Sequence, residues 1–288
     1  MRLKLECLPC FLRQVLEATK MAGLSDEQKE EVMIKAIEII RNFKSYTTPP
    51  ELAKDIHGMT KVLCKDADPY KPLKKKSIEI AKEVVKDLIE DGLKGSFEDR
   101  LRFSIKLSGV GNTFDAGVYS IAEFEKVVSK VKEELEKDFK IWEFDKFLKT
   151  LEGAKRILIV GDNAGETVFD AVLAKVLGEV GEVYYGVRAE PIINDATLED
   201  AIDSGLDEVA KVISTGCSLP GVKLELCNQE FVDLFWSSDV VISKGQGNFE
   251  GLSEVKKPGL FFLLKAKCPV IASHIGVGVG NYVFLSYI

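Results

Sequence analysis

The 288-residue sequence has no apolar run that approaches the roughly 20 residues of a membrane helix. Its first positions carry scattered charges and lack the apolar block of a signal peptide. A basic excess is also absent, because the formal net charge is -7 at pH 7. Nucleic acids and anionic membranes attract proteins through a positive field, so we expect neither as the main partner. These absences predict a cytoplasmic protein.

Cysteine is sparse, and only one C-x-x-C pair occurs among the six cysteines, at Cys7 and Cys10. A structural zinc site needs about four ligands, and no second C-x-x-C supplies the other half. Buried packing thiols are therefore the leading interpretation. A redox pair and half of a zinc site are the alternatives.

Residues 10–149 have apolar positions at spacings of three and four, which is the pattern of helices with one buried face. Ser25 and Gln28 have the spacing of a capping box at a helix start. Pro49 and Pro50 predict the first turn of another helix, where proline is tolerated. The sequence therefore predicts a helical N-terminal part over residues 1–150.

The pattern changes at Arg156, where short apolar runs rich in β-branched residues begin. Such runs are typical of strands buried on both faces of a parallel sheet. The predicted strands are Ile157–Val160, Val183–Val187, Val209–Ser214, Val240–Ser243 and Leu260–Leu264, with helices at Thr167–Leu177 and Leu198–Ile202 between them. This alternation predicts an α/β fold, with a Rossmann-like, mostly parallel sheet in residues 151–288.

Ligands of open parallel sheets bind beyond the carboxyl ends of the strands, and several polar residues follow the predicted strands there. They are Asp162 and Asn163 after the first strand, Asp195 after the second, the glycine-rich segment Lys244–Glu250 after the fourth, and Lys265 and Lys267 after the fifth. Carboxylate and amide oxygens favour hard cations such as Mg²⁺ or Mn²⁺, although Co²⁺ and Ni²⁺ also fit. A cation with a lysine facing it suits a phosphoryl group, since both neutralise its oxygens.

Each of these features also has a structural alternative. Asp162, Asn163 and Asp195 are residue types that cap helices, and Gly245 with Gly247 is a common turn pattern. Their convergence at one edge of one sheet favours the functional interpretation.

The chain resembles the damage-control phosphatases, a metal-dependent family. The resemblance is carried by GDNAGE at 161–166, IINDAT at 192–197 and KGQGNFE at 244–250, and CLPCFLRQ at 7–14, DPYKPLK at 68–74 and GNTFDAG at 111–117 are similar to its archaeal and bacterial branch. It implies a helical part joined to an α/β part.

The resemblance also implies site residues. Asp162, Asn163 and Asp195 match the residues that bind the metal in that family, and Asp162 also matches the aspartate associated with catalysis. A phosphate-binding lysine belongs to an R-T-x-K pattern in other branches, and FLLK at 262–265 keeps the lysine without the arginine and threonine. Lys265 is therefore the catalytic lysine expected here, with Lys267 as the alternative. The expected substrate-binding residues are Asn112, Asp115, Glu166, Lys244, Gly245, Gly247, Asn248 and Lys267.

The sequence thus predicts a divalent-metal-dependent phosphatase that hydrolyses phosphate monoesters of small metabolites, such as sugar phosphates. Attack by Asp162 and attack by an activated water both fit. One alternative is an S-adenosylmethionine-dependent carboxyl methyltransferase, although a DN pair and no G-x-G follows the first strand. The other is a non-catalytic protein that binds a metal or metabolite. The oligomeric state is left open.

Overall fold

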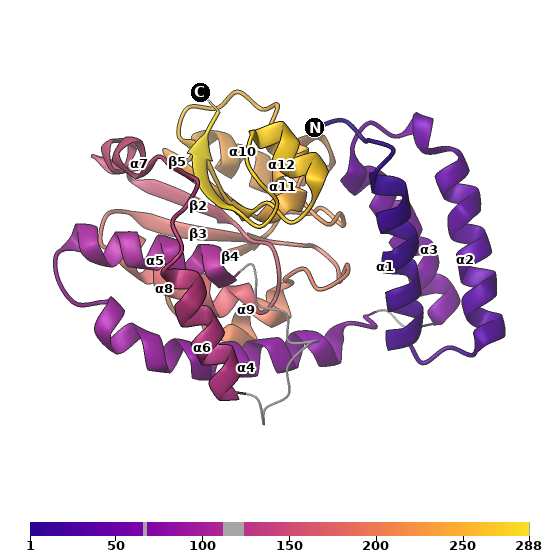
Figure 1. The fold of residues 1–288 in the computed structure, drawn as a ribbon. Helices are drawn as coiled ribbons and strands as arrows, with labels where there is room; N and C mark the ends of the chain where they lie inside the picture. The colour runs from indigo at the N-terminus through magenta and orange to yellow at the C-terminus, as the bar shows by residue number, and fades with distance from the viewer. Residues whose placement is uncertain (66–67, 112–123, 288) are drawn as a thin grey trace.

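A computed structural model describes residues 1–65, 68–111 and 124–287 (Figure 1). Three helices form a bundle at the N-terminus: α1 (Cys7–Met21), α2 (Asp26–Arg41) and α3 (Pro49–Cys64), with a short 3₁₀ turn η1 (Phe43–Ser45) before α3. The predicted capping box at Ser25 is confirmed, because its hydroxyl accepts from the Gln28 N–H and the Gln28 side chain accepts from the Ser25 N–H. Pro49 and Pro50 open α3, as the sequence predicts.

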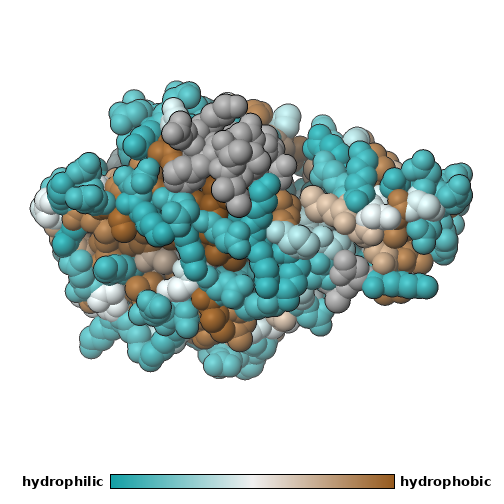
Figure 2. All heavy atoms as spheres, turned by 90° about the horizontal axis from the view of Figure 1, so that it is seen from below, coloured by the Kyte–Doolittle hydropathy of each residue, from teal (hydrophilic) through white to brown (hydrophobic). Residues whose placement is uncertain are grey.

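The bundle has its own apolar core and lies beside the rest of the chain in Figure 1. Three helices follow in the chain: α4 (Lys71–Gly92), α5 (Phe97–Gly111) and α6 (Phe124–Leu135). They pack with α7 (Phe144–Leu151) and α8 (Glu166–Leu177) against one face of a sheet. The face of the molecule on the α4 side is covered largely by hydrophilic side chains (Figure 2).

The sheet has seven strands in the order β1-β7-β6-β5-β2-β3-β4. They are β1 (Ile141–Trp142), β2 (Arg156–Val160), β3 (Glu182–Val187), β4 (Lys211–Ser214), β5 (Val240–Lys244), β6 (Leu260–Lys265) and β7 (Tyr282–Ser286). Every neighbouring pair is parallel except β6 with β7. The predicted α/β fold with a mostly parallel sheet is confirmed.

Alternate residues of each strand enter two separate cores, as the pleat requires. In β2, Ile157 and Ile159 face α4, α5 and α8, whereas Leu158 and Val160 face the opposite layer. That second layer consists of α10 (Gln229–Ser237), α11 (Gly245–Leu252) and α12 (Pro269–Ile275). Because helices cover both faces, the strands read as continuous apolar runs, which is why the sequence reveals them.

The chain order within the sheet defines where a ligand should bind. From β2 the chain moves outward to β3 and β4, and it then returns to the other side of β2 as β5 and continues to β6. The order reverses between β2 and β5, so a crevice opens at their carboxyl ends. The remaining connections are α9 (Leu198–Ser204) and the 3₁₀ turns η3 (Leu206–Glu208) and η4 (Leu224–Leu226).

Two strands of the sheet, β1 and β7, were not predicted from the sequence. The first, β1, is two residues long and pairs with β7, so the sheet begins before residue 151. The division of the chain at residue 150 stays a prediction. No helix in residues 1–65, 68–111 and 124–287 is long and apolar enough to cross a membrane.

Candidate active site

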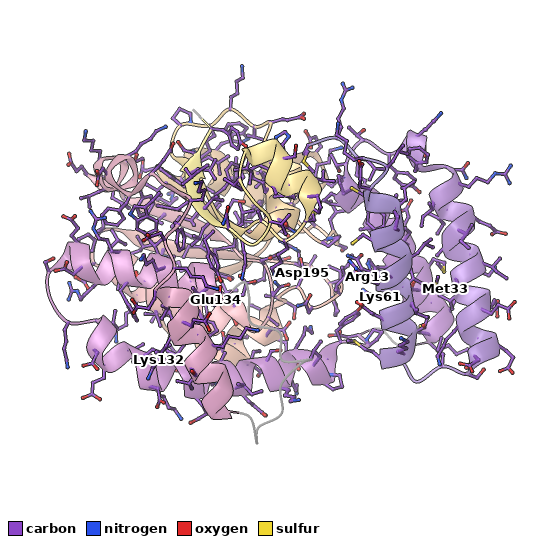
Figure 3. All side chains as sticks on the ribbon, in the orientation of Figure 1. Arg13, Met33, Lys61, Lys132, Glu134 and Asp195 are labelled. Carbon is purple, nitrogen blue, oxygen red and sulfur yellow. The ribbon has the colours of Figure 1, made fainter. Side chains whose placement is uncertain are left out.

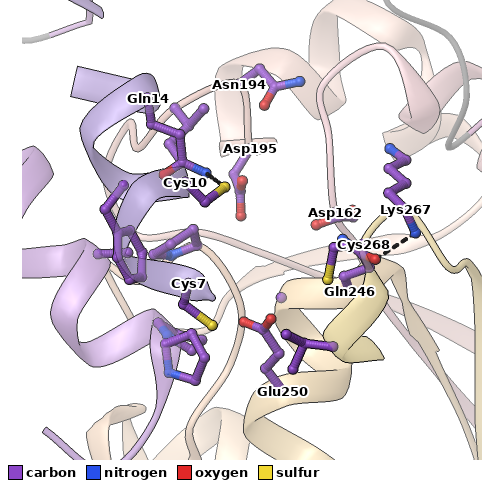
Figure 4. Close-up of a pocket in the computed structure, with 18 of the residues that line it drawn as sticks. Cys7, Cys10, Gln14, Asp162, Asn194, Asp195, Gln246, Glu250, Lys267 and Cys268 are labelled. Atoms are coloured by element: carbon purple, nitrogen blue, oxygen red, sulfur yellow. Dashed lines mark hydrogen bonds between the residues drawn. The ribbon is translucent and has the colours of Figure 1, made fainter. Parts of the chain in front are cut away.

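A cavity of about 300 Å³ lies between the helical bundle and the carboxyl edge of the sheet (Figure 4). The bundle contributes one wall through α1 and α3. The other wall comes from the loops after β2, β3, β4 and β6 and from the starts of α11 and α12. A contact from α3 holds the two parts together, because the Lys61 ammonium donates to the carbonyl oxygen of Pro191 in the loop after β3. Asp195 lies at the edge of the sheet that faces Arg13 and Lys61 of the bundle (Figure 3).

The loops after β2 and β3 are joined to each other. Asn163 and Asp195 form an isolated antiparallel bridge, the Ala164 N–H donates to the Asn194 carbonyl at 2.9 Å, and the Ala196 N–H donates to the Asp162 carbonyl at 2.8 Å. Asp162, Asn163 and Asp195 all line the cavity. The three predicted metal-binding residues are therefore close neighbours on the two central loops.

Asp195 is not the N-cap of α9, and Asn163 is not the N-cap of α8. Thr197 begins α9 in a capping box with Asp200, and Gly165 precedes α8 without a side-chain cap. Ile193, in the same loop as Asp195, has a φ of 47°. A β-branched residue at positive φ is strained, and such strain persists where the surrounding contacts hold it in place.

Arg188 is a buried arginine that contacts the acidic residues of the site. It follows β3 directly, is only 1 % exposed, and its Nε donates to Asp195 Oδ2 at 2.7 Å. Its Nη2 donates to the Asn248 side chain at 3.0 Å and lies 3.9 Å from Asp162 Oδ1. One guanidinium group thereby fixes the Asp195 carboxylate and a residue of α11 in the same place.

The carboxyl groups are crowded. Burial, followed by the nearby charges of Glu166 and Asp195, raises the pKa of Asp162 to about 8. Burial also raises the pKa of Asp195 to about 6, and the Arg188 ion pair opposes that rise. Crowding of the carboxyl groups therefore opposes their ionisation, and a cation bound between them would favour the charged forms again.

Glycine at position 245 is required by a close approach. A Cβ atom there would lie 1.9 Å from Asp162 Oδ2, and the φ of Gly245 is 73°. Gly247 is equally constrained, since its Cβ would lie 2.3 Å from the Pro220 carbonyl oxygen. These two predicted site residues act through their lack of a side chain.

Three predicted substrate-binding residues are buried beneath the cavity. The Lys244 ammonium is fully buried and bonds to Asp170 Oδ1 at 2.6 Å, Glu166 Oε2 at 3.1 Å and the Ser108 carbonyl at 3.1 Å. Asn248 donates to the carbonyls of Gly161 and Lys244 at 2.8 and 2.7 Å. Glu166, Lys244 and Asn248 support the loops of the site and are not among the described residues that line the cavity.

The two candidate lysines differ in position. Lys267 lines the cavity, is exposed, and lies near Asp162 in Figure 4. Its N–H donates to the Gln246 side chain at 2.6 Å. The Lys265 ammonium instead pairs with Glu134 of α6 at 3.0 Å and lies over the Tyr282 ring. Asn112 and Asp115 lie outside the described residues.

Gln14, Cys268 and Glu250 line the cavity and were not predicted as site residues, and neither was Arg188, which pairs with Asp195 outside the cavity lining. Cys7 and Cys10, for which the sequence offered a redox pair or half of a zinc site as alternatives, also line the cavity. Burial raises the pKa of Glu250 to about 8. The position of Arg188 immediately after a predicted strand is the signal that could have identified it.

The residues present fit a hard divalent cation. Asp162, Asn163 and Asp195 offer only oxygen ligands. Because Asn163 Nδ2 donates to Glu166 at 2.6 Å and Asp162 at 3.2 Å, its amide oxygen is the atom that can bind a cation. Among the described residues, no cluster of three or more His, Cys, Asp and Glu side chains is arranged to hold a metal ion. The set of Asp162, Asn163 and Asp195 is not such a cluster, because it has only two carboxylates.

The chain is similar to several known proteins. The damage-control phosphatase ARMT1-like domain matches residues 3–283. A damage-control phosphatase of Pyrococcus horikoshii is 37% identical over 98% of this chain and 97% of its own, and an uncharacterised protein of Methanocaldococcus jannaschii is 36% identical over 99% and 95%. A damage-control phosphatase of Archaeoglobus fulgidus is 30% identical over 96% of each chain.

The same likeness holds in three dimensions. The crystal structure of a DUF89 family protein from Pyrococcus horikoshii superposes with a TM-score of 0.92 at 35% identity and covers 100% of both chains. The match extends over the helical bundle and the sheet alike. The chain belongs to the ARMT1-like family of damage-control phosphatases.

Proposed function

We propose that this phosphatase depends on a divalent cation and hydrolyses phosphate monoesters of small metabolites, such as sugar phosphates. The observation that carries the proposal is the bridge between Asn163 and Asp195, which joins the loops after β2 and β3 around one cavity. The side-chain oxygens of Asp162, Asn163 and Asp195 thus lie beside the point where the strand order reverses, which supports their proposed role as metal ligands. Ligands of open α/β sheets bind at such points.

The charge balance supports a cation at this point. Four buried or largely buried carboxylates, those of Asp162, Glu166, Asp170 and Asp195, are accompanied by two buried cations, Arg188 and Lys244. With all four carboxyl groups ionised, the negative charges would outnumber the positive ones, which is why the pKa of Asp162 is raised, and a bound divalent cation would neutralise the excess. When bound, such a cation would also withdraw charge from the phosphoryl oxygens of a substrate.

Asp162 is the proposed catalytic group. Gly245 lets its carboxylate approach the backbone at the end of β5, and Arg188 limits its movement from the other side. In this position the carboxylate either attacks the phosphorus atom or accepts a proton from an attacking water. Positioning of this kind supplies much of the rate enhancement in phosphoryl transfer.

A lysine ammonium completes the proposed site by donating to a phosphoryl oxygen. Lys267 lines the cavity, which favours it as the phosphate-binding lysine. Lys265 is paired with Glu134, but its position in the sequence matches the family's lysine better. The amide groups of Gln14, Asn194 and Gln246 can donate to and accept from the hydroxyl groups of the metabolite. The cavity of about 300 Å³ matches a small metabolite and excludes a folded macromolecule.

The proposal is tested by the release of inorganic phosphate from a panel of sugar and other metabolite monophosphates, with each of Mg²⁺, Mn²⁺, Co²⁺ and Ni²⁺ and with a chelator. We expect release to require a cation and to be lost in Asp162→Asn. Asp203→Asn, which changes an exposed aspartate of α9, is the matched control and should keep wild-type activity. Equal release in the presence of a chelator would contradict the metal dependence.

A further inference from the structure

The wall of the cavity contains three cysteines that the proposed phosphatase chemistry does not use. Cys7 and Cys10 come from the first turn of α1, and Cys268 precedes α12. All three are half-buried and open to the same cavity (Figure 4). They are therefore accessible to a small molecule that enters it, unlike packing thiols in a core.

The Cys10 sulfur has two hydrogen-bond donors beside it. Its Sγ accepts from the Arg13 guanidinium at 3.7 Å and from the Gln14 amide at 3.8 Å. Donors of this kind, and cationic donors above all, favour the negatively charged sulfur that acts as a nucleophile.

The orientation of Gln14 is set by a buried histidine. His57 of α3 is 3% exposed, and its Nε2 lies 3.2 Å from Gln14 Oε1. Because an amide oxygen only accepts, His57 Nε2 carries the proton and Gln14 directs its NH₂ group at Cys10. The bundle core thus holds a donor against the Cys10 sulfur.

Cys7 and Cys268 differ from Cys10 in their surroundings. Burial raises the pKa of Cys7 to about 11, so it remains a thiol at neutral pH. The Cys268 sulfur accepts from the Ile271 N–H at 3.5 Å and caps α12, which gives it a structural role. Cys10 is the nucleophile of the group, and Cys7 is its neighbour three residues away.

A bridge between Cys7 and Cys10 is compatible with the helix. Residues three apart on a helix have Cβ atoms roughly 5–6 Å apart, whereas a disulfide needs about 3.5–4.5 Å. The turn must therefore tighten, and it can do so because Cys7 is the first residue of α1. The N–H groups of a first turn have no partner inside the helix, so tightening there breaks few bonds.

We propose that Cys7 and Cys10 form a redox-active dithiol whose oxidant is a small organic disulfide entering the cavity. The Cys10 thiolate attacks one sulfur of the disulfide, which forms a mixed disulfide and expels one thiolate. Cys7 then loses its proton to that thiolate and attacks Cys10 Sγ, which closes the Cys7–Cys10 bond and expels the second thiolate. The dithiol is oxidised, the small disulfide is reduced to two thiols, and no other reactant is needed.

The oxidation would change the cavity wall opposite the carboxylates. The Cys10 sulfur would no longer accept from Gln14 in its present position, so the amide would turn toward the cavity. The inference does not depend on the proposed phosphatase mechanism, since it concerns the bond between two sulfur atoms.

The test treats the full-length protein with hydroxyethyl disulfide and locates the products by intact mass and peptide mapping. Wild type should lose two hydrogen atoms and contain a Cys7–Cys10 bridge. Cys7→Ser should retain one hydroxyethylthio group on Cys10, and Cys10→Ser should carry none on residue 7. Cys64→Ser, which alters a half-buried cysteine outside the cavity, is the matched control and should behave as wild type.

A second variant separates a reactive thiol from an accessible one. Arg13 is exposed, so Arg13→Met should fold normally, and in the Cys7→Ser background it should slow adduct formation on Cys10 several-fold. A bridge from Cys10 to Cys268, an adduct on Cys7 in Cys10→Ser, the absence of any bridge in wild type, or an unchanged rate in Arg13→Met would each overturn the proposal. Circular dichroism and thermal unfolding confirm that every variant compared is folded.

Discussion

Gly245 and Asp162 approach so closely that an added Cβ on the glycine would lie 1.9 Å from Oδ2 of the aspartate. This contact couples the end of β5 to the carboxylate at the end of β2. A side chain at position 245 would push Asp162 out of the place where it and Asp195 share the cavity. We expect Gly245→Ala to weaken Mg²⁺ binding at least tenfold, measured by calorimetry.

Gly153→Ala is the control for that substitution. Gly153 has nearly the same φ, 75°, but its added Cβ would meet nothing within 4 Å. Gly153→Ala should lose about 1–2 kcal/mol of stability, because alanine is disfavoured at positive φ, and Gly245→Ala should lose more because its Cβ also meets Asp162. Only Gly245→Ala should lose metal affinity, and equal affinities in the two variants would contradict the role of the close approach.

Arg188 balances the charge of Asp195 in the interior. Arg188→Met removes the guanidinium that donates at 2.7 Å and leaves the carboxylate unpaired, which should cost on the order of 3–5 kcal/mol without metal. Saturating Mg²⁺ should restore part of that loss, since the cation replaces the missing positive charge. Chemical unfolding with Mg²⁺ and with chelator measures both effects.

Exposed Arg41→Met is the control for arginine removal and should change stability little in either condition. An Arg188→Met variant that gains no more from Mg²⁺ than wild type does would contradict the account of the charge balance.

The two candidate lysines are separated by kinetics. Lys267→Ala removes the ammonium that lines the cavity, so kcat/KM should fall by roughly ten- to a hundredfold while stability is unchanged. Lys265→Ala breaks the 3.0 Å ion pair with the buried Glu134 and should act mainly on thermal stability. The opposite pattern, a loss of kcat/KM confined to Lys265→Ala, would assign phosphate binding to Lys265.

His57 predicts a pH dependence of stability. Burial lowers the pKa of His57 to about 4, below the value of about 6.5 in an unfolded chain. Between these values the unfolded state binds more protons, so stability present above pH 6.5 is lost as the pH falls toward 4. Urea unfolding should therefore show a loss of about 2 kcal/mol from this group between pH 7.5 and pH 5.

His57→Gln should lack that part of the pH dependence, because its amide does not titrate. The control is His274→Gln, which changes an exposed histidine and should keep the wild-type slope. The same slope in His57→Gln as in wild type would show that another group is responsible.

The central strands were predictable because β2, β5 and β6 are largely buried on both faces and contain uninterrupted apolar runs, and β3 is buried over most of its length. Two strands, β1 and β7, were not predicted, each for a local reason. The first strand, β1, is two residues long, and β7 lies beyond the last strand–helix alternation and pairs antiparallel with β6. An apolar run at 282–285 was the available signal for β7.

The candidate site was predictable only in part. Asp162, Asn163 and Asp195 follow strands, and parallel topology alone brings such residues to one edge. The burial of Lys244 was not predictable, because its partners Asp170 and Ser108 come from α8 and α5. Nor does spacing reveal that the C-x-x-C of α1 faces the sheet, since that depends on how the bundle docks.

The most direct test of the metal-dependent phosphatase is phosphate release from the monophosphate panel, measured for wild type, Asp162→Asn and Asp203→Asn with and without divalent cations. The account predicts cation-dependent release by wild type and Asp203→Asn, and none by Asp162→Asn. Undiminished release by folded Asp162→Asn, or release that a chelator leaves unchanged, would contradict it. No release with any cation, together with binding of S-adenosylmethionine, would favour a methyltransferase instead.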